Sequence, residues 1–146
     1  MGIVATSVAT FLAVIALIHF SDKRFKVGCE DFLHRVNGSS FFFYNSRRNS
    51  VEFAKETVVP QLQPATKVIF VDGEDIDCGP DSKFVSHMLY DIKEKQGFPY
   101  LIKVIDEEPV YYSVNNLFYN TMTNKKPLTP LLQRINAFYD APIISE

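Results

Sequence analysis

Two cysteines are the residues of this chain best suited to covalent chemistry. Among 146 residues the thiols are Cys29 and Cys78, which form neither a Cys-x-x-Cys pair nor a zinc-binding pattern. Cys78 begins the stretch Cys78-Gly79-Pro80-Asp81-Ser82, directly before a predicted helix whose N-terminus favours a thiolate. The nearby carboxylates of Asp75 and Asp77 oppose that effect. We therefore expect an inert turn cysteine, with a reactive thiol at Cys78 as the alternative, and leave open whether the two cysteines pair.

The other residues that bind metals or act in catalysis form no recognised motif. His34 and His87 have no partner at ligand spacing, and no nucleophile elbow, phosphate-binding loop or dinucleotide fingerprint is present. Carboxylates suit Ca²⁺, but the acidic loop lacks the spacing and central glycine of an EF-hand, so we expect it to be solvated. This loop contains Asp72, Glu74, Asp75 and Asp77. No catalytic residue, metal site or cofactor is predicted.

Two polar segments carry binding hypotheses. Arg47 and Arg48 lie in the loop at residues 45–50, and guanidinium groups pair well with the carboxylates of an acidic partner. A solvated basic loop is the alternative. Asn37-Gly38-Ser39 is an N-glycosylation sequon, which makes Asn37 a candidate modification site. The net charge of −2 lacks the basic excess of a nucleic-acid binder, so no nucleic-acid partner is expected.

The N-terminal residues 3–20 form an apolar run without Asp, Glu, Lys or Arg. At about 18 residues the run reaches the lower limit for spanning a bilayer and exceeds the usual apolar core of a signal peptide. We predict that residues 1–21 are an uncleaved single-pass anchor in an organelle or endomembrane, and that residues 3–20 form one helix packing little against the domain. A cleaved signal sequence of a secreted protein and a buried helix are the alternatives.

The side of the membrane is left open because two signals oppose each other. Lys23, Arg24 and Lys26 follow the apolar run, and the positive-inside rule would keep this flank on the cytosolic side. Glycosylation at Asn37 would require the lumenal side. We give the charges slightly more weight.

The rest of the chain alternates between predicted helices and strands. We expect a linker with a short helix at 22–38, and strands at 40–44, 67–71, 100–105 and 110–113, the last two joined as a hairpin. Asn49 and Glu52 predict a capping box for a helix that runs to about residue 62, where Pro60 shortens it. A second helix begins at 81–82 and is predicted to stop at Gly97, and a last one begins at 129–130.

The order β, α, β, α, β-hairpin, α predicts an α/β sandwich whose first two strands are parallel. Together with Gly97-Phe98-Pro99-Tyr100-Leu101 before the third strand, this order resembles the thioredoxin-like superfamily over residues 39–139, within an expected thioredoxin-like domain at 39–146. The resemblance implies a cis Phe98-Pro99 bond close to residues 47–50, and a backbone edge there that pairs with an extended partner chain. Pro99 and an exposed Tyr100 are then candidate partner-binding residues.

The same resemblance implies the loss of the family's chemistry. The redox cysteines of the family follow the first strand, where this chain has the cysteine-free loop 45–50. Thiol exchange requires a thiolate, which a serine hydroxyl cannot replace. Cys78-Gly79-Pro80 begins like the family's active site but follows the second strand. We expect a non-catalytic, membrane-anchored module that binds protein as an accessory subunit, with a single-thiol redox protein using Cys78 as the alternative.

Overall fold

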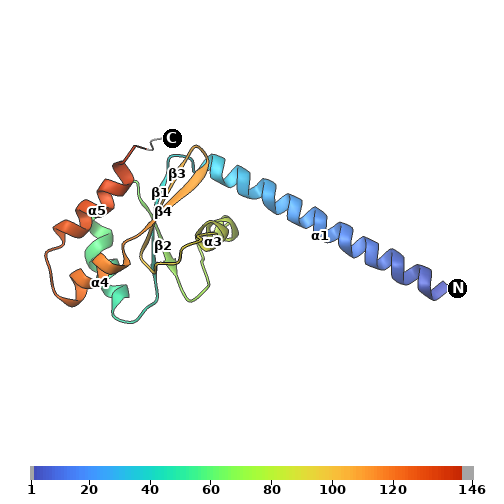
Figure 1. The fold of residues 1–146 in the computed structure, drawn as a ribbon, viewed down its shortest axis with the longest axis horizontal. Helices are drawn as coiled ribbons and strands as arrows, with labels where there is room; N and C mark the ends of the chain where they lie inside the picture. Colours follow the sequence, from blue (N-terminus) through green and yellow to red (C-terminus); the bar gives the residue numbers. More distant parts are fainter. Residues whose placement is uncertain (1, 143–146) are drawn as a thin grey trace.

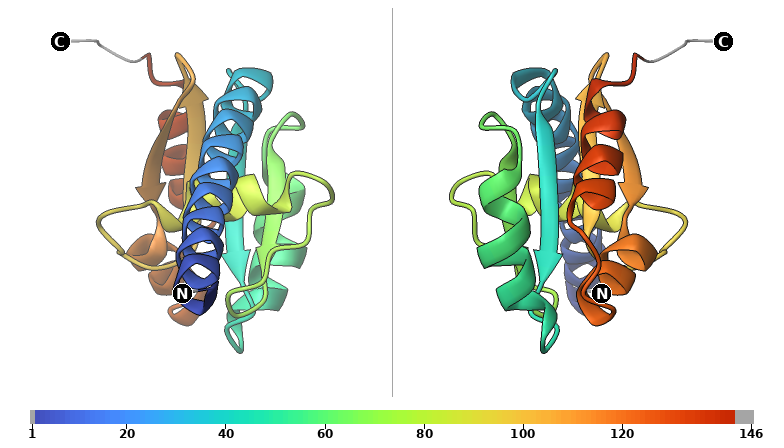
Figure 2. Two further views of the ribbon diagram at one scale, coloured as in Figure 1. Left: turned by 90° about the vertical axis from the view of Figure 1, so that its right-hand side faces the viewer. Right: turned by 90° about the vertical axis from the view of Figure 1, so that its left-hand side faces the viewer.

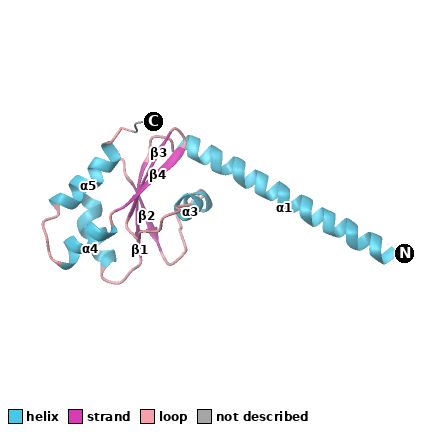
Figure 3. Cartoon of the chain, in the orientation of Figure 1, coloured by secondary structure: helices cyan, strands magenta, loops and turns pink. Residues whose placement is uncertain are grey.

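The aromatic run Phe41-Phe42-Phe43 forms the centre of a four-stranded mixed sheet. The computed structural model describes residues 2–142 and places β1 (Ser40–Asn45) between β2 (Lys67–Val71) and β3 (Tyr100–Ile105), with β4 (Glu108–Ser113) beyond β3. β1 is parallel to β2 and antiparallel to β3, and β3 and β4 form an antiparallel hairpin. The predicted strands, the parallel first pair and the hairpin are confirmed (Figures 1 and 3).

Alternate side chains of the sheet feed two separate apolar cores, because successive residues of a strand point to opposite faces. Phe41 and Phe43 join a core with the end of α1 (Gly2–Arg35) and with α3 (Ser82–Tyr90). Phe42, between them, joins a core with the helices on the other face. Figure 2 shows these layers from both sides, with α1 in front of the sheet in one view and α5 in front in the other.

The α1 helix is continuous for 34 residues. This corrects the expected linker and short helix at 22–38: the segment from 22 to 35 continues the same helix, and only a turn remains before β1. The apolar part of α1 is exposed, with Phe11 at 66% and Leu17 at 68%. The part from Thr6 to Arg35 is long and apolar enough to cross a membrane and is consistent with a single span or a signal sequence. The expected continuous helix that packs little against the domain is confirmed.

The second half of α1 packs on α3. A Cβ atom added at Gly28 would lie 2.6 Å from the ring of Phe84, so the glycine permits a close approach of the two helices. The ring of Phe25 contacts both Phe84, at 5.8 Å between centroids, and His87, at 5.2 Å. The helix thus projects from the domain but is attached to it over several turns (Figure 1).

The helix after β1 has the predicted bounds but not the predicted cap. It consists of α2 (Ser50–Glu52), a π-helical turn η1 (Phe53–Val58) and a 3-10 turn η2 (Val59–Gln61) that contains Pro60. The expected capping box is wrong, because Asn49 has a left-handed backbone with a φ of 73° and its side chain makes no capping hydrogen bond. Ala54 and Val58 are buried, so the predicted apolar face is confirmed at these two positions.

The C-terminal half contains one helix that the sequence pattern did not predict. α4 (Asn115–Thr123) follows β4 directly and packs beside α5 (Thr129–Asp140) on the face opposite α3. The expected stop of α3 at Gly97 is also wrong: α3 ends at Tyr90, and residues 91–99 form an irregular segment before β3. The hairpin turn places Asp106 and Glu107 at φ of 51° and 63°, as a two-residue primed turn requires.

Lys103 is a charged side chain in the sheet that is only 5% exposed. Its ammonium donates hydrogen bonds of 2.8 Å to the carbonyls of Phe138 and Ala141, at the end of α5. The last carbonyls of a helix lack intrahelical donors and carry partial negative charge, so a cation there satisfies both needs. Lys103 therefore attaches α5 to the sheet.

Candidate functional site

Four segments meet where β1, β2 and β4 end and β3 begins. The register brings Phe43 opposite Tyr100, and Tyr100 opposite Ser113. The loop 46–49 joins the loop after β2, because the amide of Ser46 donates to the carbonyl of Val71 at 3.0 Å. The irregular segment 91–99 reaches the same end of the sheet. This end holds Arg47, Arg48 and Pro99, which the sequence predicted to lie together.

The Phe98-Pro99 peptide bond is cis, so this expectation is confirmed. Gly97 before it has a φ of 96°, a conformation that favours glycine. A Cβ atom at Gly97 would lie 2.8 Å from the side-chain amide of Asn115, so a larger residue would also displace the Asn115 side chain. Gly97 thus positions the segment rather than ending α3.

The backbone acceptors of the cis-proline segment are already occupied within the chain. The carbonyl of Gly97 accepts from the hydroxyl of Ser113 at 2.6 Å, and that of Phe98 from the side-chain amide of Asn115 at 2.6 Å. The carbonyl of Pro99 accepts from the amide of Val114 at 3.1 Å. These three bonds use acceptors that an extended partner chain would otherwise engage.

The expected exposed edge at Pro99 and Tyr100 is wrong. Pro99 is buried, and Tyr100 is only 5% exposed. The hydroxyl of Tyr100 accepts a hydrogen bond of 2.8 Å from the amide of Gly97, and its ring contacts Phe98. Both residues are therefore part of the packing of the segment, and a partner would have to contact its neighbours.

The loop 46–49 has no thiol, and the first residue of the following helix is buried. The hydroxyl of Ser50 donates to the carbonyl of Arg47 at 2.8 Å, and Ser50 is 4% exposed. The guanidinium of Arg47 lies 4.9 Å from the centre of the Tyr119 ring, within the range of cation–π attraction. Arg48 is exposed. The loop therefore presents two cations, Arg47 held against the Tyr119 ring and Arg48 exposed to solvent, and it contains no thiol.

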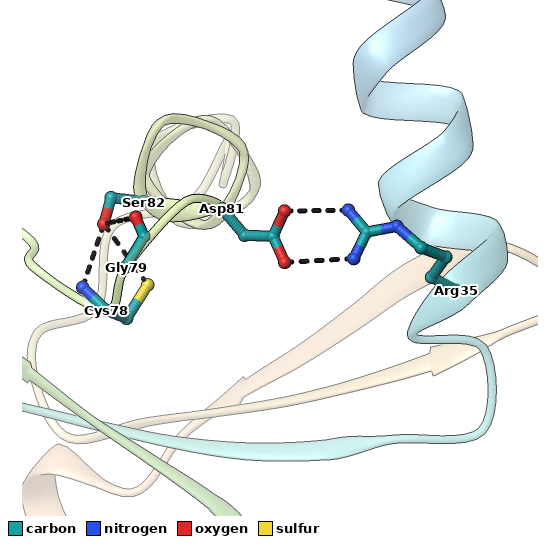
Figure 4. A network of polar contacts seen from close by, with 5 residues as sticks. All are labelled: Arg35, Cys78, Gly79, Asp81 and Ser82. Carbon is teal, nitrogen blue, oxygen red and sulfur yellow. Dashed lines mark hydrogen bonds and ion pairs between the residues drawn. The ribbon is translucent and has the colours of Figure 1, made fainter.

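Cys78 lies in the turn that leads into α3 (Figure 4). Its amide donates to the Ser82 hydroxyl at 2.9 Å, and that hydroxyl is 2.7 Å from the carbonyl of Gly79 and 3.7 Å from the thiol. The carboxylate of Asp81 is paired with Arg35 of α1. Cys78 is exposed and lies before the first turn of α3, which begins at Ser82.

Cys29 lies on α1, at the contact with α3. Both cysteines are free thiols, so Cys29 and Cys78 are not paired in this structure. Cys29 is half-buried, and burial raises the pKa of its thiol, while the charge of Lys83 lowers it. A protonated, partly shielded thiol is a poor nucleophile.

The described residues contain no group of three or more His, Cys, Asp or Glu side chains that could hold a metal ion. The acidic loop is exposed at Asp72, Glu74, Asp75 and Asp77. His34 instead pairs with Glu107 of the hairpin turn at 2.6 Å, and this hydrogen bond raises the pKa of the imidazole. The exposure of these four carboxylates agrees with the expected solvated loop.

Asn37 is exposed in the turn between α1 and β1. Its side-chain oxygen accepts a hydrogen bond of 3.0 Å from the amide of Glu107. The sequon therefore lies at the opposite end of the sheet from Arg47 and Pro99, because β1 begins beside Asn37 and ends before Arg47. A glycan there would not obstruct the loop end.

Two surface cavities open beside the cis-proline segment. The larger, of about 600 Å³, is polar and is lined by Gln96, Ser113, Asn115 and Arg134 among others. The second, of about 250 Å³, is apolar and lies between the end of α3 and the segment, against Leu89, Ile92 and Phe98. The residue pattern did not indicate the roles of Asn115 and Lys103. Ser113, whose hydroxyl accepts from the amide of Asn115 at 3.2 Å, was the available signal for the start of α4.

Comparison of the chain with protein-family models, with curated proteins and with solved structures finds no match in any of the three. What is established is therefore the architecture: an α/β protein with a long N-terminal helix and a four-stranded mixed sheet in the order β2-β1-β3-β4.

Proposed function

We propose that the chain is a single-pass, membrane-anchored thioredoxin-like module that binds a protein partner and has no thiol redox activity. The observation that carries this proposal is the loop 46–49: it follows the central strand beside a cis-proline segment, yet it offers Arg47 and Arg48 and no cysteine. The sheet order supports the family assignment. The exposed apolar half of α1 supports anchorage.

The binding surface is the loop end of the sheet, without the buried Pro99 and Tyr100. Exposed Arg48 is free to pair with a carboxylate of the partner, and Arg47 presents its charge from a position fixed by Tyr119. The apolar cavity of about 250 Å³ beside the cis-proline segment, on the α3 side of the sheet, has room for one apolar side chain. The partner would then be a subunit of a larger membrane assembly, and this chain would be its accessory subunit.

Photo-crosslinking in membranes tests the binding function. A photoreactive residue replaces exposed Glu52 in the full-length chain, and crosslinked partners are compared between variants. R47A/R48A should weaken capture, more strongly at low salt because rim charges act mainly on association. K125A/K126A, which removes two exposed lysines between α4 and α5, is the matched control and should capture normally.

The cysteine variant separates binding from redox chemistry. C29S/C78S should keep its partner, because no step of the proposed function uses a thiol. If C29S/C78S loses the partner while R47A/R48A retains it, the proposal is wrong and the exposed free thiol of Cys78 becomes the reactive group.

Carbonate extraction tests the anchorage. The full-length protein should stay in the membrane pellet, and mass spectrometry should find an N-terminus that retains residues 3–20. Release into the supernatant with a shortened N-terminus would instead identify a cleaved signal sequence and a secreted protein.

A further inference from the structure

β2 is an unprotected edge of the sheet. It pairs with β1 on one side, and no other strand of the described residues 2–142 pairs with its outer side. A free edge presents backbone donors and acceptors to other strands, and proteins usually blunt it with proline, charge or a bulge. Between Val68 and Val71 the strand has none of these features.

The other edge of the sheet carries a proline that β2 lacks. Both edge strands begin with a charged residue, Lys67 in β2 and Glu108 in β4, but only β4 contains a proline, Pro109, which cannot donate a hydrogen bond to a further strand. The ring of Tyr112 is also stacked on Phe138 of α5, at 5.8 Å between centroids. β2 is therefore more available than β4 for pairing with a further strand.

The side chains of β2 add an apolar surface to its free backbone. Val68 is 38% exposed and Phe70 is 41% exposed, although neighbouring Ile69 and Val71 are buried on the opposite face. The ring centroids of Phe70 and Tyr44 lie 5.2 Å apart, so the exposed apolar surface extends from β2 onto β1. Apolar side chains that are half-exposed beside a free edge are suited to contact with another strand.

We propose that β2 pairs antiparallel with β2 of a second copy of this chain, with the two Ile69 residues opposite each other. In this register Val68 of each copy lies opposite Phe70 of the other, on the same face. Lys67 lies opposite Val71 of the other copy. Val68 and Phe70 flank Ile69 symmetrically, so an antiparallel copy places the half-exposed apolar residues of each chain against those of the other.

The direction of α1 selects this pairing among those that two copies could make. α1 leaves the sheet on the α3 side and runs away from it (Figure 1). An antiparallel pair is related by a two-fold axis perpendicular to the sheet, which keeps both α1 helices on one side. A parallel pair would turn one sheet over and direct its α1 to the opposite side. This step rests on the proposed anchorage, since two anchors in one membrane must leave on the same side.

Disulfide formation in detergent tests the pairing and its register, using full-length chains in a C29S/C78S background. V68C mixed with F70C should form a crosslinked dimer on oxidation, whereas each variant alone should crosslink several-fold less because it faces an unmodified residue. Equal crosslinking in all three samples would overturn the register. Absence of any crosslinked dimer would overturn the proposal.

Light scattering tests the dimer without crosslinks. The unmodified chain should have the mass of two chains, and V68K/F70K should have the mass of one. Both positions are already exposed, so these lysines should leave the fold intact, as circular dichroism would verify. Y111K, at a residue of β4 that is 38% exposed, is the control and should remain dimeric.

The outcomes separate this inference from the proposed function. A monomeric wild type, or a V68K/F70K protein that stays dimeric, overturns the β2 pairing. Failure of carbonate retention or of the arginine-dependent crosslink overturns the proposed function and leaves a measured dimer standing.

Discussion

Arg35 in the last turn of α1 holds Asp81 at the start of α3 through two hydrogen bonds of 2.7 and 3.1 Å (Figure 4). The pair joins residues 46 positions apart in the chain. Each charge also complements the helix end on which it lies, because cations are favoured at C-termini and anions at N-termini. The pair thus contributes to the attachment of the projecting helix to the domain.

Acid should remove the contribution of this pair. The hydrogen bond from Arg35 lowers the pKa of Asp81 below 3.8, so its stabilisation is present above that pH and is lost as the pH falls through the lowered pKa. R35Q should lower the urea midpoint of the full-length protein modestly at pH 6. The difference from wild type should shrink as the pH falls below about 3.8 and through the lowered pKa of Asp81. A constant difference throughout that range would contradict the pairing.

The His34–Glu107 pair should act in the opposite pH range. Its hydrogen bond raises the pKa of His34 above 6.5, so stabilisation is complete below that pH and is lost as the pH rises through the raised pKa. H34Q should therefore lower the urea midpoint at pH 6 and match wild type at about pH 9. E107Q should reproduce this profile, and H34Q/E107Q should lower the midpoint no further than either single variant.

Gly28→Ala should lower the stability of the α1–α3 contact. Alanine favours a helix over glycine by about 1 kcal/mol, but its Cβ atom would lie 2.6 Å from the Phe84 ring, and overpacking costs about 1–3 kcal/mol. We expect a net loss of about 1 kcal/mol in the free energy of unfolding, measured with urea in detergent. In an F84A background the same substitution should become neutral or stabilising. Stabilisation by G28A with Phe84 present would mean that the helices are farther apart.

Lys103→Met should destabilise the protein by about 2 kcal/mol, because the carbonyls of Phe138 and Ala141 at the end of α5 lose a charged donor. The amides near residues 138–141 should exchange faster with deuterium before the rest of the fold is affected. Lys126→Met, at an exposed position before α5, should leave both quantities unchanged. Loss of protection confined to other regions would contradict the role of Lys103.

The element order could be predicted from residue patterns because each pattern reports local burial. The aromatic run at β1 and the apolar face of α3 predicted a buried strand and a helix in the places where they occur. The apolar residues 3–20 likewise predicted an exposed helix. Proline before β3 predicted the cis bond, and the absence of cysteine from the loop 46–49 excluded a thiol there.

Only the tertiary structure decided which of these residues are accessible, because accessibility depends on elements distant in the sequence. Tyr100 is an amphipathic residue that could lie at the surface, but Gly97 and the α3 layer cover it. The side-chain amide of Asn115 donates to the carbonyl of Phe98, and Asn115 lies on α4, which follows the β3–β4 hairpin in the chain. β2 is an edge because β3 and β4 both lie on the far side of β1. The sequence by itself determined the four strands and the helices other than α4, whereas the order of the strands in the sheet decided which surfaces remain available to a partner.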